Sequence, residues 1–194
     1  MKFKFIIYTL LISCLTYTGC TDSGENLEKE GIDEALLDFN QFSLNPYDIP
    51  ATILLPDETS NIGASTKVEV VHVEGDFLWD IKVGPNFDLV INDWGTDKYI
   101  LNAEVKKLKN LDFYNVKFLK KTPTTLVYER TLNVKGKKNA PKNVGIEHKS
   151  YHLFMTKSIN DIIYTFETND IGTTKEIAEL EEKCINSIQE IKKS

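Results

Sequence analysis

The fold of this chain is decided by residues 77–91, which read FLWDIKVGPNFDLVI. On both sides of Gly84-Pro85 the apolar residues occupy every second position, and polar residues such as Asp80 and Lys82 lie between them. The apolar set consists of Phe77, Trp79, Ile81, Val83, Phe87, Leu89 and Ile91. A period of two that is interrupted by Gly and Pro is typical of half-buried antiparallel strands joined by a turn. The stretch therefore predicts the centre of an antiparallel meander.

The same alternation recurs along the chain and extends the predicted sheet. Further strands are expected at residues 51–55, 68–73, 115–121, 125–134, 147–156 and 161–168. A helix is expected from Asp97 to about Leu111, with Leu101, Val105 and Leu108 on its inward face. The predicted fold class is therefore α+β, an antiparallel sheet flanked by helices.

The C-terminal segment has the clearest helical pattern. Thr173 and Glu176 have the spacing of a capping box. The apolar stripe behind them consists of Ile177, Leu180, Cys184, Ile188 and Ile191, while Glu179, Glu181, Glu182 and Glu190 are expected to lie off it. Because Cys184 belongs to the stripe, we interpret it as a buried small hydrophobic residue and not as a nucleophile.

Residues 1–19 have the pattern of a secretory signal peptide. Lys2 and Lys4 precede an apolar run from Phe5 to Leu15, which is shorter than the ~20 apolar residues that a membrane-spanning helix needs. Thr18 and Gly19 then lead into Cys20. This ending resembles the lipobox of bacterial lipoproteins, which implies cleavage before Cys20 and acylation of that residue. The alternative is an ordinary signal peptide with a chance cysteine.

The lipoprotein interpretation implies a location and a domain organisation. Two or more acyl chains would hold the protein stably on a membrane, and Thr21 after the cysteine favours the outer membrane of the bacterial envelope by resemblance. Residues 20–45 are acidic and are expected to be a tether, and residues 46–194 to be one α/β domain. With Cys14 removed and Cys20 lipidated, Cys184 would have no disulfide partner within the chain.

Charge is distributed unevenly along the chain. Residues 104–149 contain 12 basic and four acidic residues, whereas the whole chain has a net charge of −6. The overall acidity argues against nucleic-acid binding. The basic stretch predicts either a surface for an anionic partner or a solvated lysine-rich helix and loop, with the candidate lysines being Lys106, Lys107, Lys109, Lys135, Lys137 and Lys138.

Several segments together resemble the PsbP-like domain. They are the entry segment NPYDIPATILLP at residues 45–56, the strand NFDLVI at residues 86–91, the helix from Leu101 to Leu108, the strand LVYE at residues 126–129, and IYTFE at residues 163–167 before the terminal helix. The resemblance covers about residues 46–192 and implies an α/β/α sandwich. It implies no catalytic residue, because the matching segments belong to the fold.

Few residues suggest chemistry. No G-x-S-x-G, Walker, H-E-x-x-H or C-x-x-C motif occurs. His148 and His152 would lie about 13 Å apart on a strand, too far to share a metal ion. Trp94 could stack on a ligand or sugar, although we favour a plug between sheet and helix. Arg130, the only arginine in the chain, could clamp a substrate, although an ion pair with Glu129 is favoured.

The sequence thus predicts a lipid-anchored envelope protein with no catalytic site, cofactor or metal. We expect a binding or scaffold module for an envelope partner. One alternative is an envelope enzyme or small-ligand binder with a cleft near Trp94. Another is a sensor of anionic membrane surfaces that uses the basic region at residues 104–149.

Overall fold

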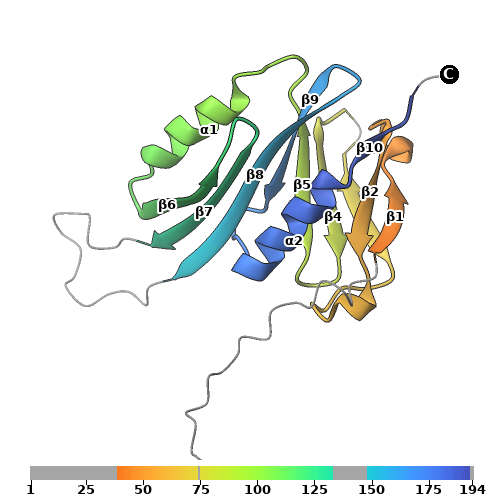
Figure 1. Cartoon of the computed structure of the whole chain (residues 1–194), viewed down its shortest axis with the longest axis horizontal. Coiled ribbons are helices and arrows are strands. Elements are labelled where there is room, and N and C mark those ends of the chain that lie inside the picture. The colour runs from red at the N-terminus through yellow and green to blue at the C-terminus, as the bar shows by residue number, and fades with distance from the viewer. Residues whose placement is uncertain (1–38, 74, 133–147, 193–194) are drawn as a thin grey trace, which may run out of the picture.

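Antiparallel strands are the main secondary-structure elements of the computed structural model, which describes residues 39–73, 75–132 and 148–192 (Figure 1). Within these ranges the larger sheet has seven strands, in the spatial order β3-β4-β5-β9-β8-β7-β6. They are β3 (Val68–His72), β4 (Leu78–Val83), β5 (Asp88–Asp93), β6 (Tyr114–Lys121), β7 (Thr125–Leu132), β8 (Lys149–Ile159) and β9 (Ile162–Thr168). The predicted meander is therefore confirmed as β3, β4 and β5.

The last long strand joins two meanders into one sheet. β9 pairs with β5 on one side, where Ile91 lies opposite Phe166, and with β8 on the other side, where Met155 lies opposite Phe166. β6, β7 and β8 are linked to one another by antiparallel pairs. β9 therefore connects this half of the sheet to the half formed by β3, β4 and β5.

A smaller sheet lies beside the larger one at the right of Figure 1. It is formed by β1 (Phe39–Ser43), β2 (Ala51–Pro56) and the short β10 (Gln189–Glu190), in the order β1-β2-β10. Residues 39–43 were expected to belong to the tether, but they pair with residues 52–56 of β2. The ordered domain therefore begins before residue 46. Short 3₁₀ helices at Asn45–Tyr47 and Glu58–Ser60 follow β1 and β2.

Two helices cover opposite faces of the larger sheet. α1 (Ile100–Lys109) packs its buried residues Leu101, Val105 and Leu108 against one apolar cluster, with Leu126, Tyr128 and Phe154 of β7 and β8. The intervening strand residues Val127, Leu153 and Met155 belong to the second cluster, with α2 (Lys175–Asn186), β2, β4, β5 and β9. Since neighbouring strand residues point to opposite faces, the helices lie on opposite sides. The α+β class and the inward face of α1 are confirmed.

The ends of the helices differ from the prediction in three respects. α1 begins at Ile100, and Asp97 accepts a hydrogen bond from the backbone of Tyr99. α2 is capped by Thr174, whose side chain accepts from Ile177 N, so the assignment of the cap to Thr173 was wrong by one residue. The helix ends at Asn186, and Ile191, predicted to lie on its stripe, is outside the helix and 38% exposed.

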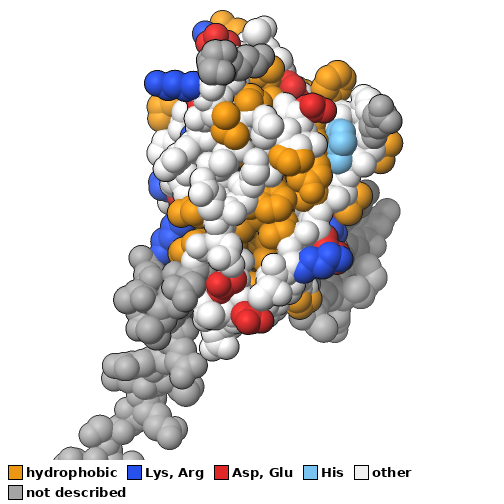
Figure 2. Space-filling view, turned by 90° about the vertical axis from the view of Figure 1, so that its right-hand side faces the viewer, with side chains coloured by type: hydrophobic (Ala, Val, Ile, Leu, Met, Phe, Trp, Pro, Cys, Tyr) orange, Lys and Arg blue, Asp and Glu red, His pale blue; other side chains and the backbone are white. Residues whose placement is uncertain are grey.

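Apolar side chains are visible on the molecular surface on the side that carries the smaller sheet (Figure 2). Figure 2 shows a band of hydrophobic side chains down the middle of this side of the molecule. Phe39, Phe42, Val68 and Val70 are among the partly buried residues that pack against the main core. Within the described ranges, no helix combines the length and the apolar character needed to cross a bilayer.

Candidate functional site

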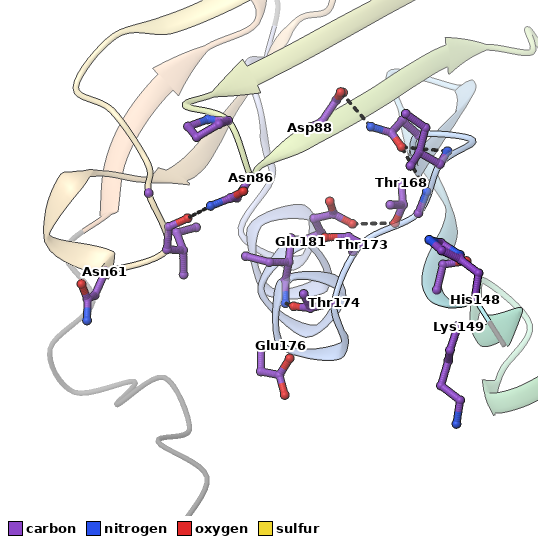
Figure 3. A pocket seen from close by; sticks show the side chains of 18 residues that line it. Asn61, Asn86, Asp88, His148, Lys149, Thr168, Thr173, Thr174, Glu176 and Glu181 are labelled. Carbon is purple, nitrogen blue, oxygen red and sulfur yellow. Dashed lines mark hydrogen bonds between the residues drawn. The ribbon is translucent and has the colours of Figure 1, made fainter. Parts of the chain in front are cut away.

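A polar cleft lies where the N-terminus of α2 meets the ends of several strands (Figure 3). Its volume is about 760 Å³, which is within the roughly 300–1,000 Å³ typical of small-molecule sites. Its walls come from the loop at residues 61–63, the β4–β5 turn at residues 85–86, the start of β8, and the segment at residues 168–177. Segments far apart in the sequence therefore converge on one hollow.

The segment between β9 and α2 forms one wall of the cleft. Leu89 pairs with Thr168 at the end of β9, and the chain pairs again with β8 only at Thr173, which exchanges two backbone hydrogen bonds with Tyr151. The residues between them bulge out of the sheet. Asn169 holds this bulge, because its side-chain oxygen accepts hydrogen bonds from the backbone of Ile171 and Gly172.

Glu181 of α2 lies among the residues that line the cleft and is labelled in Figure 3. Its exposed fraction is 0%. The Thr168 hydroxyl donates to Glu181 Oε2 at 2.7 Å and accepts from Leu153 N at 2.9 Å. The other carboxyl oxygen, Oε1, is buried and has no hydrogen-bond partner among the described residues. A buried polar atom without a partner is costly, so this oxygen needs an explanation.

Burial also changes the ionisation of this carboxyl group. It raises the pKa of Glu181 to about 8, and the charge of Asp88 acts in the same direction, against the lowering effect of the Thr168 hydrogen bond. The prediction that Glu181 lies off the buried stripe was therefore wrong. The sequence spacing could have predicted that Glu181 is buried. Glu181 follows Ile177 by four residues and precedes Ile185 by four, so it lies between two buried residues on one face of the helix.

A pair of carboxyl groups, those of Asp80 and Asp88, lies on β4 and β5. Lys82 Nζ is 3.1 Å from Asp80 Oδ2 and 3.3 Å from Asp88 Oδ2, and Asn169 donates to Asp88 Oδ2 at 2.9 Å. Burial, followed by the hydrogen bond with Asp88, raises the pKa of Asp80 to about 6. Asp88 also lines the cleft, so the bulge at Asn169 links the cleft to this pair. Sequence reasoning identified neither Glu181 nor these two aspartates as site residues.

Trp94 lies at a separate hollow of about 350 Å³, which Asp76, Phe77, Leu78, Asn92 and Asp93 also line. Its indole Nε1 donates to Thr165 Oγ1 at 3.0 Å, and 43% of the residue is exposed. The two apolar clusters formed by the described residues do not include it. Trp94 is thus fixed to β9 while almost half of it is exposed, and both the plug between sheet and helix and the ligand contact stay predictions.

Arg130 is held within the sheet surface, away from the Trp94 hollow. Its guanidinium carbon lies 4.5 Å from the ring centre of Tyr114, and its Nη2 donates to the backbone oxygen of Asp170. The expected ion pair with Glu129 is wrong, because Glu129 contacts Lys149 at 3.3 Å instead. Arg130 thus fastens the bulge after β9 to β7.

The two histidines of the β8 segment have different environments. His148 is exposed, whereas His152 is 2% exposed, stacks on Tyr128 and contacts Ser150 Oγ through Nε2 at 2.8 Å. The predicted extended conformation of this segment is confirmed by β8. Among the described residues, His, Cys, Asp and Glu form no group of three or more that could hold a metal ion. Cys184 is fully buried, as predicted, and burial raises its pKa to about 12.

The remaining predicted residues divide between described and undescribed parts of the chain. Lys106, Lys107 and Lys109 are exposed on α1, and Lys107 contacts Glu104 at 3.1 Å. Lys135, Lys137 and Lys138 lie outside the described residues, as do Thr18, Gly19 and Cys20. Comparisons with protein-family models, curated proteins and solved structures gave no match to this chain.

Proposed function

We propose that this protein is a lipid-anchored protein of the bacterial envelope whose PsbP-like domain is a non-catalytic binding module, and that its ligand occupies the α2 cleft. The observation that carries the proposal is Glu181, a fully buried residue in a cleft of about 760 Å³ whose carboxyl Oε1 lacks a partner among the described residues. A ligand that pairs with this oxygen would remove the cost of leaving it unsatisfied.

The arrangement of the cleft supports binding over a purely structural role. Thr168, Asn169 and Asn86 hold their positions through hydrogen bonds to other elements. A site with preorganised polar groups loses less entropy when it binds a ligand. Thr168 is the last residue of β9, whereas Asn86 and Asn169 lie in the connecting segments before β5 and after β9, so these hydrogen bonds fix two loops of the cleft wall to the rest of the domain.

Two experiments test the proposal. Changing Cys20 to Ala should move the protein from the membrane fraction to the soluble fraction, whereas continued membrane retention would contradict the lipid anchor. Separately, the full-length protein in detergent can be screened against a small-molecule library by thermal shift. Hits are then located by hydrogen–deuterium exchange.

The location of the exchange effect decides between the two hollows. Slower exchange at residues 61–63 and 169–177 on ligand addition supports the α2 cleft. Slower exchange confined to residues 92–95 would place the ligand at Trp94 and contradict the proposed site. A diverse library that yields no stabilising compound would contradict a small-ligand module, and crosslinking in cells would then identify a protein partner.

A further inference from the structure

We propose that the ligand of the α2 cleft is a small molecule that carries a primary ammonium group, which donates a hydrogen bond to Glu181 Oε1. This inference rests on the proposed function, because it names the chemical class of the ligand for that same cleft. Three features support it: the acceptors left without partners, the charge of the lining and the state of the helix N-terminus.

Two side-chain oxygens of the cleft can each accept a hydrogen bond from a ligand, Glu181 Oε1 once its carboxyl group is ionised and Asn86 Oδ1. Glu181 Oε1 is buried without a partner among the described residues. Asn86 uses its side-chain nitrogen to donate to the backbone oxygen of Ile62 at 2.8 Å, so its carbonyl oxygen is left as an acceptor. Figure 3 shows both side chains among those that surround the hollow. An ammonium group has three donors and no acceptor, which matches this inventory.

The charged lining favours a cation over an anion. The lining includes the carboxyl groups of Asp88, Glu176 and Glu181, and one lysine, Lys149. The ammonium of Lys149 is directed to Glu129 at 3.3 Å. An anionic ligand would therefore face carboxyl groups. A cation would face two buried carboxyl oxygens that have no hydrogen-bond partner among the described residues, Glu181 Oε1 and Asp88 Oδ1. Of these two groups, Asp88 already has Lys82 as its countercharge.

The N-terminus of α2 does not reverse this preference. A helix N-terminus attracts negative charge, but here Thr174 accepts from Ile177 N and Glu176 is in the first turn. The protein therefore supplies its own acceptor and its own negative charge at that position. An external anion would add a second negative charge beside Glu176.

Binding of an ammonium ligand should release a proton. Without ligand, burial keeps the Glu181 carboxyl group protonated, with a pKa of about 8. A cation beside it favours the carboxylate, so the proton passes to the buffer. The other titratable groups near Glu181 are Asp88 on β5 and Cys184 on its own helix, with Glu176, Lys149 and His148 also on the cleft lining.

The probe for this inference is 1,4-diaminobutane, compared with two four-carbon molecules of similar length, the neutral diamide succinamide and the dianion succinate. Isothermal titration calorimetry of the full-length protein in detergent measures affinity and, with buffers of different ionisation heats, the protons released. We expect the diamine to bind at millimolar concentration or better and to release close to one proton near pH 7. Proton release is measured on the unmodified chain, so it does not depend on a variant folding.

Glu181→Gln should weaken diamine binding at least about tenfold, the loss of one charged hydrogen bond. Glu179→Gln is the matched control, because it makes the same substitution on the same helix at an exposed position and should leave the affinity within about twofold. An equal loss in both variants would overturn the inference.

The other outcomes separate this inference from the proposed function. If succinamide or succinate binds as tightly as the diamine, the ammonium class is wrong while the cleft remains a ligand site. If the diamine binds without releasing a proton, the contact with Glu181 is wrong. If none of the three binds at millimolar concentration, the ammonium inference is overturned, and the library screen decides separately whether the cleft is a binding site.

Discussion

Gly172 lies directly against the imidazole ring of His152. A Cβ atom placed on Gly172 would be 2.5 Å from both Cε1 and Nε2 of His152, and the backbone there has a φ of +80°. The bulge after β9 can therefore close over β8 only with glycine at this position. The contact joins one wall of the cleft to β8 of the sheet.

Changing Gly172 to Ala should destabilise the domain strongly. The positive φ alone costs an alanine roughly 1–2 kcal/mol, and overlap with the ring adds to it, so we expect a loss of about 3 kcal/mol in the free energy of unfolding. Gly95→Ala is the control, because Gly95 has a φ of +59° but a Cβ added there would meet no atom within 4 Å. Urea unfolding measures both, and equal losses would show that the ring contact is unimportant.

His152 should contribute to acid unfolding. Burial lowers its pKa from 6.5 to about 4, with the charge of Arg130 acting in the same direction. Below pH 6.5 the unfolded chain takes up a proton on this ring that the folded chain does not. Stability should therefore be lost as the pH falls from 6.5 towards 4. The imidazole Cε1 proton, followed by NMR, should not titrate near pH 6.5, and a midpoint there would contradict the prediction.

Glu181 should have the opposite effect on the pH dependence of stability. Its pKa is raised to about 8 in the folded chain from about 4.3 when unfolded, so between these values the folded chain holds one more proton. Stability then falls with rising pH, by at most ~1.4 kcal/mol per pH unit from this group. Glu181→Gln should gain stability relative to the unmodified chain as the pH rises towards 8. Urea unfolding across this range, with Glu179→Gln as the control, measures the difference, and parallel curves for all three proteins would contradict it.

The cap of α2 can be assigned by a pair of neighbouring substitutions. Thr174→Ala removes the oxygen that accepts from Ile177 N and should cost about 1 kcal/mol. Thr173→Ala should cost less, because Thr173 contacts Tyr151 through backbone atoms that the substitution keeps. Thermal unfolding compares the two, and a larger loss for Thr173→Ala would restore the sequence-based assignment of the cap.

Much of the sheet and of α1 could be predicted because burial there follows a simple period. Phe87, Leu89 and Ile91 are 0% exposed on one face of the meander, and Leu101, Val105 and Leu108 are buried on one side of α1. In both cases a single apolar face packs against a single layer. The two-residue period of a strand, or the three- and four-residue spacing of a helix, then predicts which side chains point into the core.

The cleft could not be predicted in the same way. α2 contacts the larger sheet on one side and β2 on another, so its buried surface is wider than one stripe and includes the charged Glu181. Residues 39–43 were assigned to the tether because the acidic composition of residues 20–45 does not reveal that this segment pairs with β2, its partner among the described strands. Arg130 was paired with its neighbour Glu129, whereas its actual contacts are Asp170 and Tyr114, which are distant in sequence.

The position of β9 has a consequence for when the domain can fold. Until residues 162–168 have been synthesised, the strands on either side of β9 have no common partner, and β10 at residues 189–190 completes the smaller sheet later still. Long-range pairing of this kind folds slowly compared with local contacts. Almost the whole polypeptide would therefore have left the ribosome before the two sheets of the domain can be completed. If residues 1–19 act as an export signal, as proposed, such a delay would keep the chain unfolded and able to cross a membrane.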